Sequence, residues 1–263
     1  MIFLSLSNIL EERYFQYFFA KSMVKYGYQV QLIDDTNQFH HEYDGLKLKK
    51  ANSNHWKKKF AIKRASKYQW LEYDEKTFAF HTEVFEHPSV VNHGLWISEK
   101  YFLPVSNEVT TFFSKQFEKI GAEIKGVCSN WKESHQTVFY DHQSTDSNSL
   151  YNQEMDLAFV KKALAMIRDK DSNTQLIWIG KNKDRFNLLG EGTYIDSAKK
   201  SKDEIIYLIA QAKHNIVGQD LLSWWGAWLN NNQQKFVVAP NQLFKDFRDD
   251  SSTIYPEQWA KIE

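Results

Sequence analysis

Residues 213–229 read KHNIVGQDLLSWWGAWL and decide the fold of the C-terminal half. Asn215–Val217 is a short apolar run, which predicts a buried strand. Asp220 is a good N-cap residue for Leu221–Leu229, which we expect to be a helix. Strand, turn and helix in this order form the repeating unit of a parallel α/β sheet.

The surrounding sequence continues the same alternation. Ser201-Lys-Asp-Glu204 is a capping box, and it predicts the start of a further helix. We therefore expect a second βαβ-type domain over residues 119–263. Its other predicted elements are helices at Met155–Arg168 and Pro256–Ile262, strands at Ala122–Cys128, Leu176–Ile179 and Phe236–Val238, and a polar loop at His135–Asn152. A helix at Phe113–Ile120 is expected just before this domain.

The N-terminal segment also predicts a βαβ unit. Ile2–Leu6 forms a short apolar strand, Glu11–Tyr26 places its aromatic residues on one helical face, and Val30 and Leu32 alternate with polar residues in a second strand. Residues 36–118 give a weaker signal, and Lys47–Lys67 is expected to be a solvated surface segment. Residues 1–118 and 119–263 thus predict two Rossmann-like domains that face a central cleft.

Composition and charge narrow the range of possible functions and locations. The formal net charge is zero, so no basic surface predicts nucleic-acid binding. A single cysteine, Cys128, excludes an intramolecular disulfide and is typical of a reducing compartment. The N-terminus lacks the basic region of a signal peptide, and no apolar run is long enough to span a bilayer. We expect a cytoplasmic protein, and peripheral contact with the inner face of the membrane stays open.

Four segments resemble one enzyme family in their order and approximate spacing. The strongest is the Ser223-Trp-Trp-Gly-Ala-Trp-Leu-Asn230 run with the strand before it. The others are Phe15-Gln-Tyr17, Gly94–Phe102, and Val237-Val-Ala-Pro240 followed by Ile254–Ile262. Together they resemble the bacterial α-1,2-fucosyltransferases.

The resemblance implies a GT-B fold and a GDP-sugar donor, GDP-fucose in the family, bound mainly by the C-terminal domain. It implies inverting transfer to the 2-hydroxyl of a galactose-type acceptor in surface polysaccharide assembly. No metal and no cofactor beyond the nucleotide sugar are implied. The N-terminal domain, residues 1–118, would then be the acceptor side, and other polysaccharide-assembly enzymes are candidate partners.

The predicted site residues lie around the tryptophan-bearing helix and before it. The amides at a helix N-terminus favour a diphosphate, and Ser223 in the first turn could donate to it. Trp224 is either a donor contact or a core residue that packs the helix. The predicted catalytic residues are Lys132, His135 and Asp220, and the predicted donor-binding residues are Asn130, Lys132, Lys213, Gln219, Asp220, Ser223 and Trp224.

The sequence departs from the family pattern where the chemistry is expected. Ile9–Arg13 replaces a glycine-rich loop, and Asn130–His135 is the best positional match to His-x-Arg-x-Gly-Asp, with Lys132 in the arginine position. Gln219-Asp220 replaces Asn-Ser, and Gly180–Asp184 replaces an acidic pair. Asp220 would oppose a nearby phosphate, and Lys132, Lys213 or Arg185 could offset that charge.

Three hypotheses follow. The first is a divergent glycosyltransferase that transfers a sugar from a nucleotide donor to a glycan. The second is a catalytically inactive member of the family that binds or scaffolds other polysaccharide-assembly enzymes. The third is an unrelated α/β binding protein.

Overall fold

The computed structural model describes residues 2–34, 47–50, 72–75, 77–86, 91–143, 155–244 and 252–263. The chain divides into two compact units. Unit 1 contains residues 1–109 and 249–256, and unit 2 contains residues 110–248 and 257–263. Their boundary falls within helix α4 (Ser106–Glu118), whose last residue is the predicted end of the first domain.

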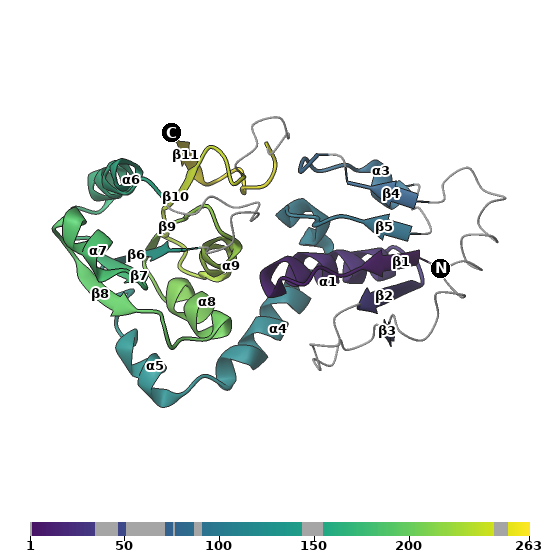
Figure 1. The fold of residues 1–263 in the computed structure, drawn as a ribbon, viewed down its shortest axis with the longest axis horizontal. Coiled ribbons are helices and arrows are strands. Elements are labelled where there is room, and N and C mark those ends of the chain that lie inside the picture. Colours follow the sequence, from purple (N-terminus) through teal and green to yellow (C-terminus); the bar gives the residue numbers. More distant parts are fainter. Residues whose placement is uncertain are drawn as a thin grey trace. The chain divides into compact units, whose positions relative to one another are not determined.

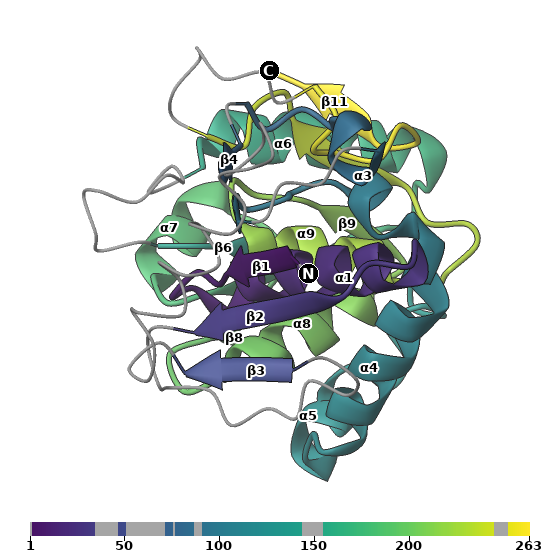
Figure 2. The same ribbon diagram turned by 90° about the vertical axis from the view of Figure 1, so that its right-hand side faces the viewer.

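Unit 1 is built on a five-stranded sheet in which every pair of strands is parallel, with the order β3-β2-β1-β5-β4 (Figures 1 and 2). Helix α1 lies against strands β1 and β2, as the βαβ prediction requires. The elements are β1 (Ile2–Ser5), α1 (Leu10–Lys25), β2 (Val30–Asp34), β3 (Lys47–Lys50), β4 (Glu72–Asp74), α3 (Glu83–Glu86), β5 (Val91–His93), and the short 3-10 helices η2 (Glu99–Tyr101) and η3 (Leu103–Val105).

Aromatic packing holds α1 in unit 1. Phe19 is fully buried and stacks on Trp96, with ring centroids 4.4 Å apart. Tyr101 meets the edge of both rings. These contacts join the helix to the segment after β5, so burial of large rings fixes the end of the sheet to the helix.

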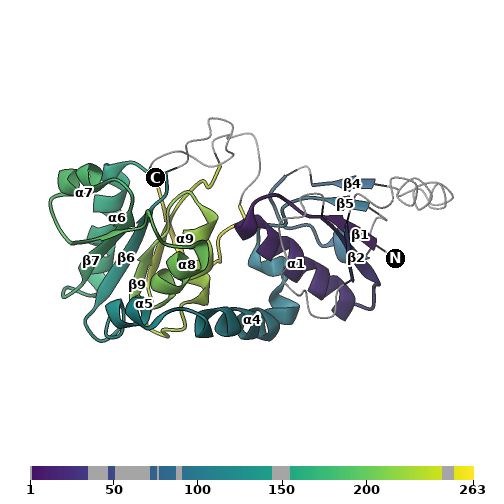
Figure 3. The same ribbon diagram turned by 60° about the horizontal axis from the view of Figure 1, so that its bottom comes forward.

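Unit 2 has a six-stranded parallel sheet in the order β11-β10-β9-β6-β7-β8. If the strands are numbered from β6 as 1 to β11 as 6 and the sheet is read from β8, the order is 3-2-1-4-5-6, which is the order of a Rossmann fold. Figure 3 shows α6 and α7 on one side of this sheet and α8 and α9 on the other. The elements are α5 (Ala122–Val127), β6 (Gln136–Asp141), α6 (Leu157–Lys170), β7 (Gln175–Gly180), α7 (Lys183–Leu189), β8 (Thr193–Asp196), α8 (Lys202–Ala210), β9 (His214–Ile216), α9 (Leu221–Leu229), β10 (Val237–Pro240) and β11 (Ala260–Ile262).

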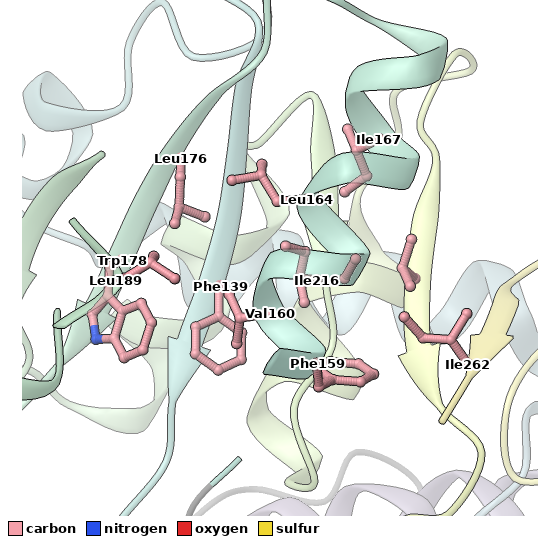
Figure 4. Packing of buried hydrophobic residues seen from close by; sticks show 12 residues of the cluster. Phe139, Phe159, Val160, Leu164, Ile167, Leu176, Trp178, Leu189, Ile216 and Ile262 are labelled. Atoms are coloured by element: carbon pink, nitrogen blue, oxygen red, sulfur yellow. The ribbon is translucent and has the colours of Figure 1, made fainter. Parts of the chain in front are cut away.

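The core of unit 2 lies between α6 and the strands. Val160, Leu164 and Ile167 recur at helical spacing and are buried, and Figure 4 shows them beside Phe139 and Ile216 of the sheet. Apolar side chains at positions i, i+4 and i+7 form one helical face, which is why this sequence packs as a helix on a sheet. The predicted helix at 155–168 is confirmed.

Helices α8 and α9 pack closely on each other. The capping box at Ser201 is present, since its side chain accepts from the Glu204 amide while Glu204 accepts from the Ser201 amide. Gly226 lets the two helices approach, because a Cβ there would lie 2.5 Å from Ile209. Trp225 is fully buried on the same helix, with its ring centroid 5.3 Å from that of Phe113.

Three predicted elements are wrong. Ala122–Val127 is helix α5 rather than a strand, and only Ile124 is buried in it. The predicted loop from His135 contains β6, a strand buried along its whole length. The predicted final helix at Pro256–Ile262 ends in strand β11, which pairs with β10 at the edge of the sheet.

The lysine-rich segment Lys47–Lys67 was predicted to be a solvated surface segment. Lys47–Lys50 forms strand β3, paired in parallel with β2, where a surface segment was expected. The rest of Lys47–Lys67 lies outside the described residues. The two Rossmann-like α/β units predicted from the sequence are confirmed, and with them the GT-B-like fold class. No helix in the described ranges is both long and apolar enough to cross a bilayer.

Candidate functional site

The strand order of unit 2 defines a switch point between β6 and β9. The chain runs outward from β6 to β7 and β8 on one side, and from β9 to β10 and β11 on the other. In open α/β sheets, ligands bind outside the carboxyl ends of the two strands where the order reverses. The candidate site is therefore formed by the residues that follow Asp141 and Ile216, the last residues of these strands.

Two buried polar atoms lie without a partner after β6. Nδ1 of His142 and Nε2 of Gln143 are shielded from solvent, and no hydrogen-bond partner for either is found within the described structure. Buried polar groups in native proteins are nearly always hydrogen-bonded, so two adjacent exceptions at one strand end call for an explanation. A polar ligand at the switch point would supply the missing partners.

A buried ion pair stands at the same strand end. Asp141 is fully buried, and its carboxylate accepts from Arg185 Nε at 3.1 Å and from the second guanidinium nitrogen at 3.3 Å. Arg185 also donates to the carbonyl of Met155 at 2.6 Å. Helix α7 supplies the arginine, so this pair ties the helix to the central strand. Arg185 therefore compensates Asp141 rather than Asp220.

The N-terminus of α9 is capped from within the chain. Asp220 accepts from the Ser223 amide and from the Ser223 hydroxyl, both at 2.7 Å, and Ser223 Oγ accepts from the Gly218 amide at 3.1 Å. Asp220, Ser223 and Trp224 are all buried. The N-cap role predicted for Asp220 is confirmed. The Ser223 hydroxyl takes part in this cap, so its predicted donation to a diphosphate stays a prediction, and Trp224 is a buried residue of the same helix.

The other predicted donor-binding residues are dispersed. Gln219 follows Gly218 at the switch point, and its side chain donates to the Gln242 carbonyl at 3.0 Å. Lys132 donates to the side chain of Asn231 at 2.6 Å. Asn130 is exposed, and its carbonyl accepts from the Ser134 amide and hydroxyl.

The segment Asn130–His135 precedes β6, so it lies at the amino end of that strand. The sequence match places this segment at the first strand of the domain, and the structure places it before that strand, at the end opposite to the switch point. The physical reason is the misplaced strand. Once β6 is recognised at 136–141, the residues at its carboxyl end are Asp141, His142 and Gln143.

His135 and Lys213 meet at the amino edge of the unit 2 sheet. His135 Nδ1 lies 2.6 Å from a carboxylate oxygen of Asp171, and Lys213 Nζ lies 2.9 Å from the same oxygen. His214 Nε2 approaches it at 3.1 Å, while its Nδ1 accepts from the Phe236 amide. Asp171, Lys213 and His214 border an open hollow of about 410 Å³, with Lys170, Gln234, Lys235 and Phe236 as its other lining residues.

The protonation of this cluster is set by its contacts. Burial alone would raise the pKa of the Asp171 carboxyl, but hydrogen bonds from Lys213, His135 and His214 outweigh it and hold that pKa well below its usual range. Burial lowers the pKa of His214, so this histidine is neutral and donates through Nε2. The cluster joins the start of β9 to the segment between α6 and β7, and Lys213 is engaged there rather than near Asp220.

We expect Asp171→Asn to lower the free energy of unfolding by about 1–2 kcal/mol at neutral pH, because it removes the charge from three hydrogen bonds. The folded-state pKa of Asp171 is depressed from its ordinary 3.8, so this stabilisation is complete above that value and is lost as the pH falls below it. Urea unfolding at a series of pH values measures both effects. The gap between wild type and variant should close on acidification.

Asp169→Asn is the matched control, because Asp169 is exposed on the same helix two positions from the cap. It should leave stability within about 0.5 kcal/mol of wild type. A variant at Asp171 that unfolds like this control at pH 7 would show that the cluster contributes no stability.

In unit 1, the turn after β1 is filled by side chains of α1. Gln16 accepts from the Ser7 amide at 2.8 Å and donates to the Gly94 carbonyl at 2.7 Å, which bridges the ends of β1 and β5. The Ser7 hydroxyl donates to Glu12, and Arg13 donates to the Ser7 carbonyl. These contacts take the place of a glycine-rich loop and fix the turn without any glycine.

Sequence reasoning missed the residues that now define the site. His142 and Gln143 fell inside the predicted loop, and the apolar Val138–Tyr140 run before them is the signal that could have revealed the strand. Asp171 carried no recognisable signal, because a lone aspartate after a helix is ordinary. Its contacts form only in the folded sheet, which brings His135, Lys213 and His214 around its carboxylate.

The fold and the switch point thus define a two-unit α/β protein whose second unit has the strand order of a Rossmann fold. No family model matches the chain. An alpha-1,2-colitosyltransferase of Escherichia coli is 26% identical over 191 residues, which is 65% of this chain and 61% of that protein. The O-antigen biosynthesis glycosyltransferase WbnK of Escherichia coli is 33% identical over 57 residues, which is 22% of this chain and 18% of that protein. The matches therefore span less than two thirds of either relative.

Among solved structures, a mutant of FUT1 from Arabidopsis thaliana in complex with GDP resembles the chain with a TM-score of 0.48 and 7% identity. The alignment covers 94% of this chain and 72% of that one.

Proposed function

We propose that the chain is a glycosyltransferase of bacterial surface polysaccharide synthesis that binds a nucleotide sugar at the carboxyl edge of the unit 2 sheet. The observation that carries this proposal is the pair of unsatisfied buried atoms on His142 and Gln143 at the switch point of a Rossmann-ordered sheet. The two relatives, both named as glycosyltransferases, support the same class.

The charges at this edge suit a diphosphate. Lys181 follows β7 directly, and Lys183 opens α7. Both side chains are exposed, and both follow the strand next to β6. They would neutralise phosphate charge in place of Lys132 and Lys213, which lie at the amino edge. Gln143 would donate to a phosphate or sugar oxygen through Nε2, and His142 would hydrogen-bond through Nδ1.

The proposal extends to the donor sugar and to the linkage that is formed. The resemblance to α-1,2-fucosyltransferases favours GDP-fucose, and the name of the first relative favours a colitosyl donor. In either case the acceptor is a galactose-type residue of a glycan, attacked through its 2-hydroxyl. Inversion follows from direct displacement of the nucleoside diphosphate by that hydroxyl.

Nucleotide sugars should stabilise the full chain in a thermal-shift screen of GDP-, UDP- and dTDP-linked sugars. A donor present at about ten times its Kd stabilises by about 1.4 kcal/mol, which corresponds to a rise in Tm of about 3–6 °C. Gln143→Ala should weaken binding about tenfold through the loss of one buried hydrogen bond. Gln233→Ala is the matched control, because Gln233 is exposed beyond α9, and it should bind like wild type.

Absence of a shift with every donor would count against the transferase. A catalytically inactive binding or scaffolding protein is the second candidate, and one observation favours it. The Ser223 amide in the first turn of α9 donates to Asp220, and the Gly218 amide before the helix donates to the Ser223 hydroxyl, so neither is free for a diphosphate. Stable capture of another polysaccharide-assembly enzyme, with no transfer by the purified chain, would support that candidate.

A further inference from the structure

The hollow at the amino edge of the unit 2 sheet lies apart from the switch point. It has a volume of about 410 Å³, and all of its lining residues belong to unit 2. These residues end α6 or lie at the starts of β9 and β10, at the opposite end of the strands from His142 and Gln143. Small-molecule sites occupy about 300–1,000 Å³. The hollow is therefore large enough for a monosaccharide derivative and small for a complete nucleotide sugar.

Cations outnumber carboxylates around this hollow. Its lining residues include three lysines and one aspartate, namely Lys170, Lys213, Lys235 and Asp171, so their formal charges sum to +2. His214 adds no charge, because burial lowers its pKa. The carboxyl ends of α6 and α9 lie beside these lysines, and each brings a partial charge of about −0.5. The remaining positive charge favours an anionic ligand.

Two of the cations are held in place by contacts within the chain. Lys213 Nζ lies 2.9 Å from Oδ2 of Asp171. Lys235 Nζ donates to the carbonyls of Ala227 at 2.8 Å and Asn230 at 2.7 Å. Neutral carbonyls fix the ammonium group of Lys235 without cancelling its charge. A positive charge that is already in position binds an anion with little further loss of side-chain entropy.

The carboxylate of Asp171 is satisfied from within the chain. Its Oδ2 lies 2.6 Å from His135 Nδ1 and 3.1 Å from His214 Nε2, in addition to Lys213. His135 reaches it from a backbone with a φ of 58°, a left-handed conformation that is rare and strained for a residue other than glycine. Hydrogen bonds from three groups reduce the repulsion that this carboxylate would exert on an anion in the hollow.

The other lining residues suit a sugar. Gln234 is exposed, and its amide can both donate to and accept from hydroxyl groups, while the half-buried Phe236 supplies an aromatic surface. We propose that the hollow binds a monosaccharide phosphate, with the phosphate beside Lys170 and Lys213 and the sugar beside Gln234 and Phe236. This site lies at the opposite edge of the sheet from the proposed donor site, so the proposal does not depend on glycosyl transfer.

The test measures the binding of glucose 1-phosphate, inorganic phosphate and glucose to the full chain by isothermal titration calorimetry at pH 7 and low salt. Lys170→Glu is the informative variant, because Lys170 is exposed and its replacement leaves the contacts of Asp171 in place. Lys161→Glu is the matched control. It makes the same change of charge at an exposed position of the same helix, about 14 Å away along the axis.

Glucose 1-phosphate should bind the wild type with a Kd of about 1 mM or lower, inorganic phosphate more weakly, and glucose without measurable heat. Lys170→Glu should raise that Kd about tenfold, and Lys161→Glu by less than about twofold. Amide hydrogen exchange with glucose 1-phosphate should slow at residues 213–214 and 234–236 and stay unchanged at 142–143.

A wild type that does not bind glucose 1-phosphate, or equal Kd values in the two lysine variants, would overturn the proposal. Protection at residues 142–143 in place of the amino edge would assign the ligand to the switch point and overturn it as well. Inorganic phosphate that binds as tightly as glucose 1-phosphate would overturn the assignment of a sugar to the hollow.

Discussion

Replacing Arg185 with methionine is expected to lower the free energy of unfolding by about 3–5 kcal/mol, which is among the largest effects of any single substitution in unit 2. The arginine is the charged partner of Asp141, whose side chain is 0% exposed. Removing one member of a buried pair leaves the other as an uncompensated charge in a medium of low polarity. Urea unfolding of the full chain at pH 7 measures the loss.

A double-mutant cycle separates charge from packing. Asp141→Asn combined with Arg185→Met should be more stable than Arg185→Met alone, because the remaining side chain is then neutral. Lys183→Met is the matched control on the same helix, where the side chain is exposed, and it should stay within about 0.5 kcal/mol of wild type. Equal losses at positions 185 and 183 would show that the ion pair is unimportant.

Gly226→Ala is expected to destabilise the chain by about 2–4 kcal/mol, although alanine has a higher helix propensity than glycine. The new methyl group would lie 2.5 Å from Cβ and Cγ2 of Ile209 and 3.1 Å from the Ile206 carbonyl. These atoms lie on or near the α8 backbone, so relief requires the two helices to separate. The gain in helix propensity, about 1 kcal/mol, does not offset this.

Gly126→Ala is the comparison that isolates the clash. Gly126 lies in helix α5, and a Cβ there would meet nothing within 4 Å, so this substitution should be neutral or stabilising. Adding Ile209→Ala to Gly226→Ala should recover part of the stability relative to the sum of the two single changes, because it removes Cγ2, one of the two obstructing atoms of Ile209. Strict additivity would contradict the close-packing explanation of this glycine.

The helices of unit 2 could be predicted because their signals are local. The capping box at Ser201 and the N-cap at Asp220 mark helix starts through contacts within three residues. The apolar spacing of Val160, Leu164 and Ile167 likewise needs no knowledge of the rest of the chain. In each case the physical cause and the sequence pattern lie in the same segment.

The central strand was missed for the opposite reason. Gln136, Thr137 and Asp141 are polar and yet buried, and Thr137 and Asp141 are satisfied by partners far along the chain. Thr137 hydrogen-bonds Thr174, and Asp141 pairs with Arg185. Without those partners the segment has the composition of a loop, and the error displaced every site residue that was assigned by reference to this strand.

The sequence places some of the predicted site residues correctly along the fold, while their donor-binding roles stay predictions. The carboxyl edge of the unit 2 sheet follows from the strand–turn–helix at 215–229, and Gln219 lies after β9 at that edge. His135 and Lys213 were grouped as site residues, and they do lie together, but around Asp171 at the amino edge. The sequence shows which residues flank a strand, whereas strand direction decides which edge of the sheet they reach.

The claim that a nucleotide sugar binds between the ends of β6 and β9 can be tested most directly by amide hydrogen exchange with and without GDP-fucose or GDP-linked colitose. We expect slower exchange at residues 142–143 and 218–219, and no change around Asp171 and Lys213 at the amino edge. Protection confined to the amino edge, or exchange that is unaltered throughout unit 2 at a saturating donor concentration, would contradict the account.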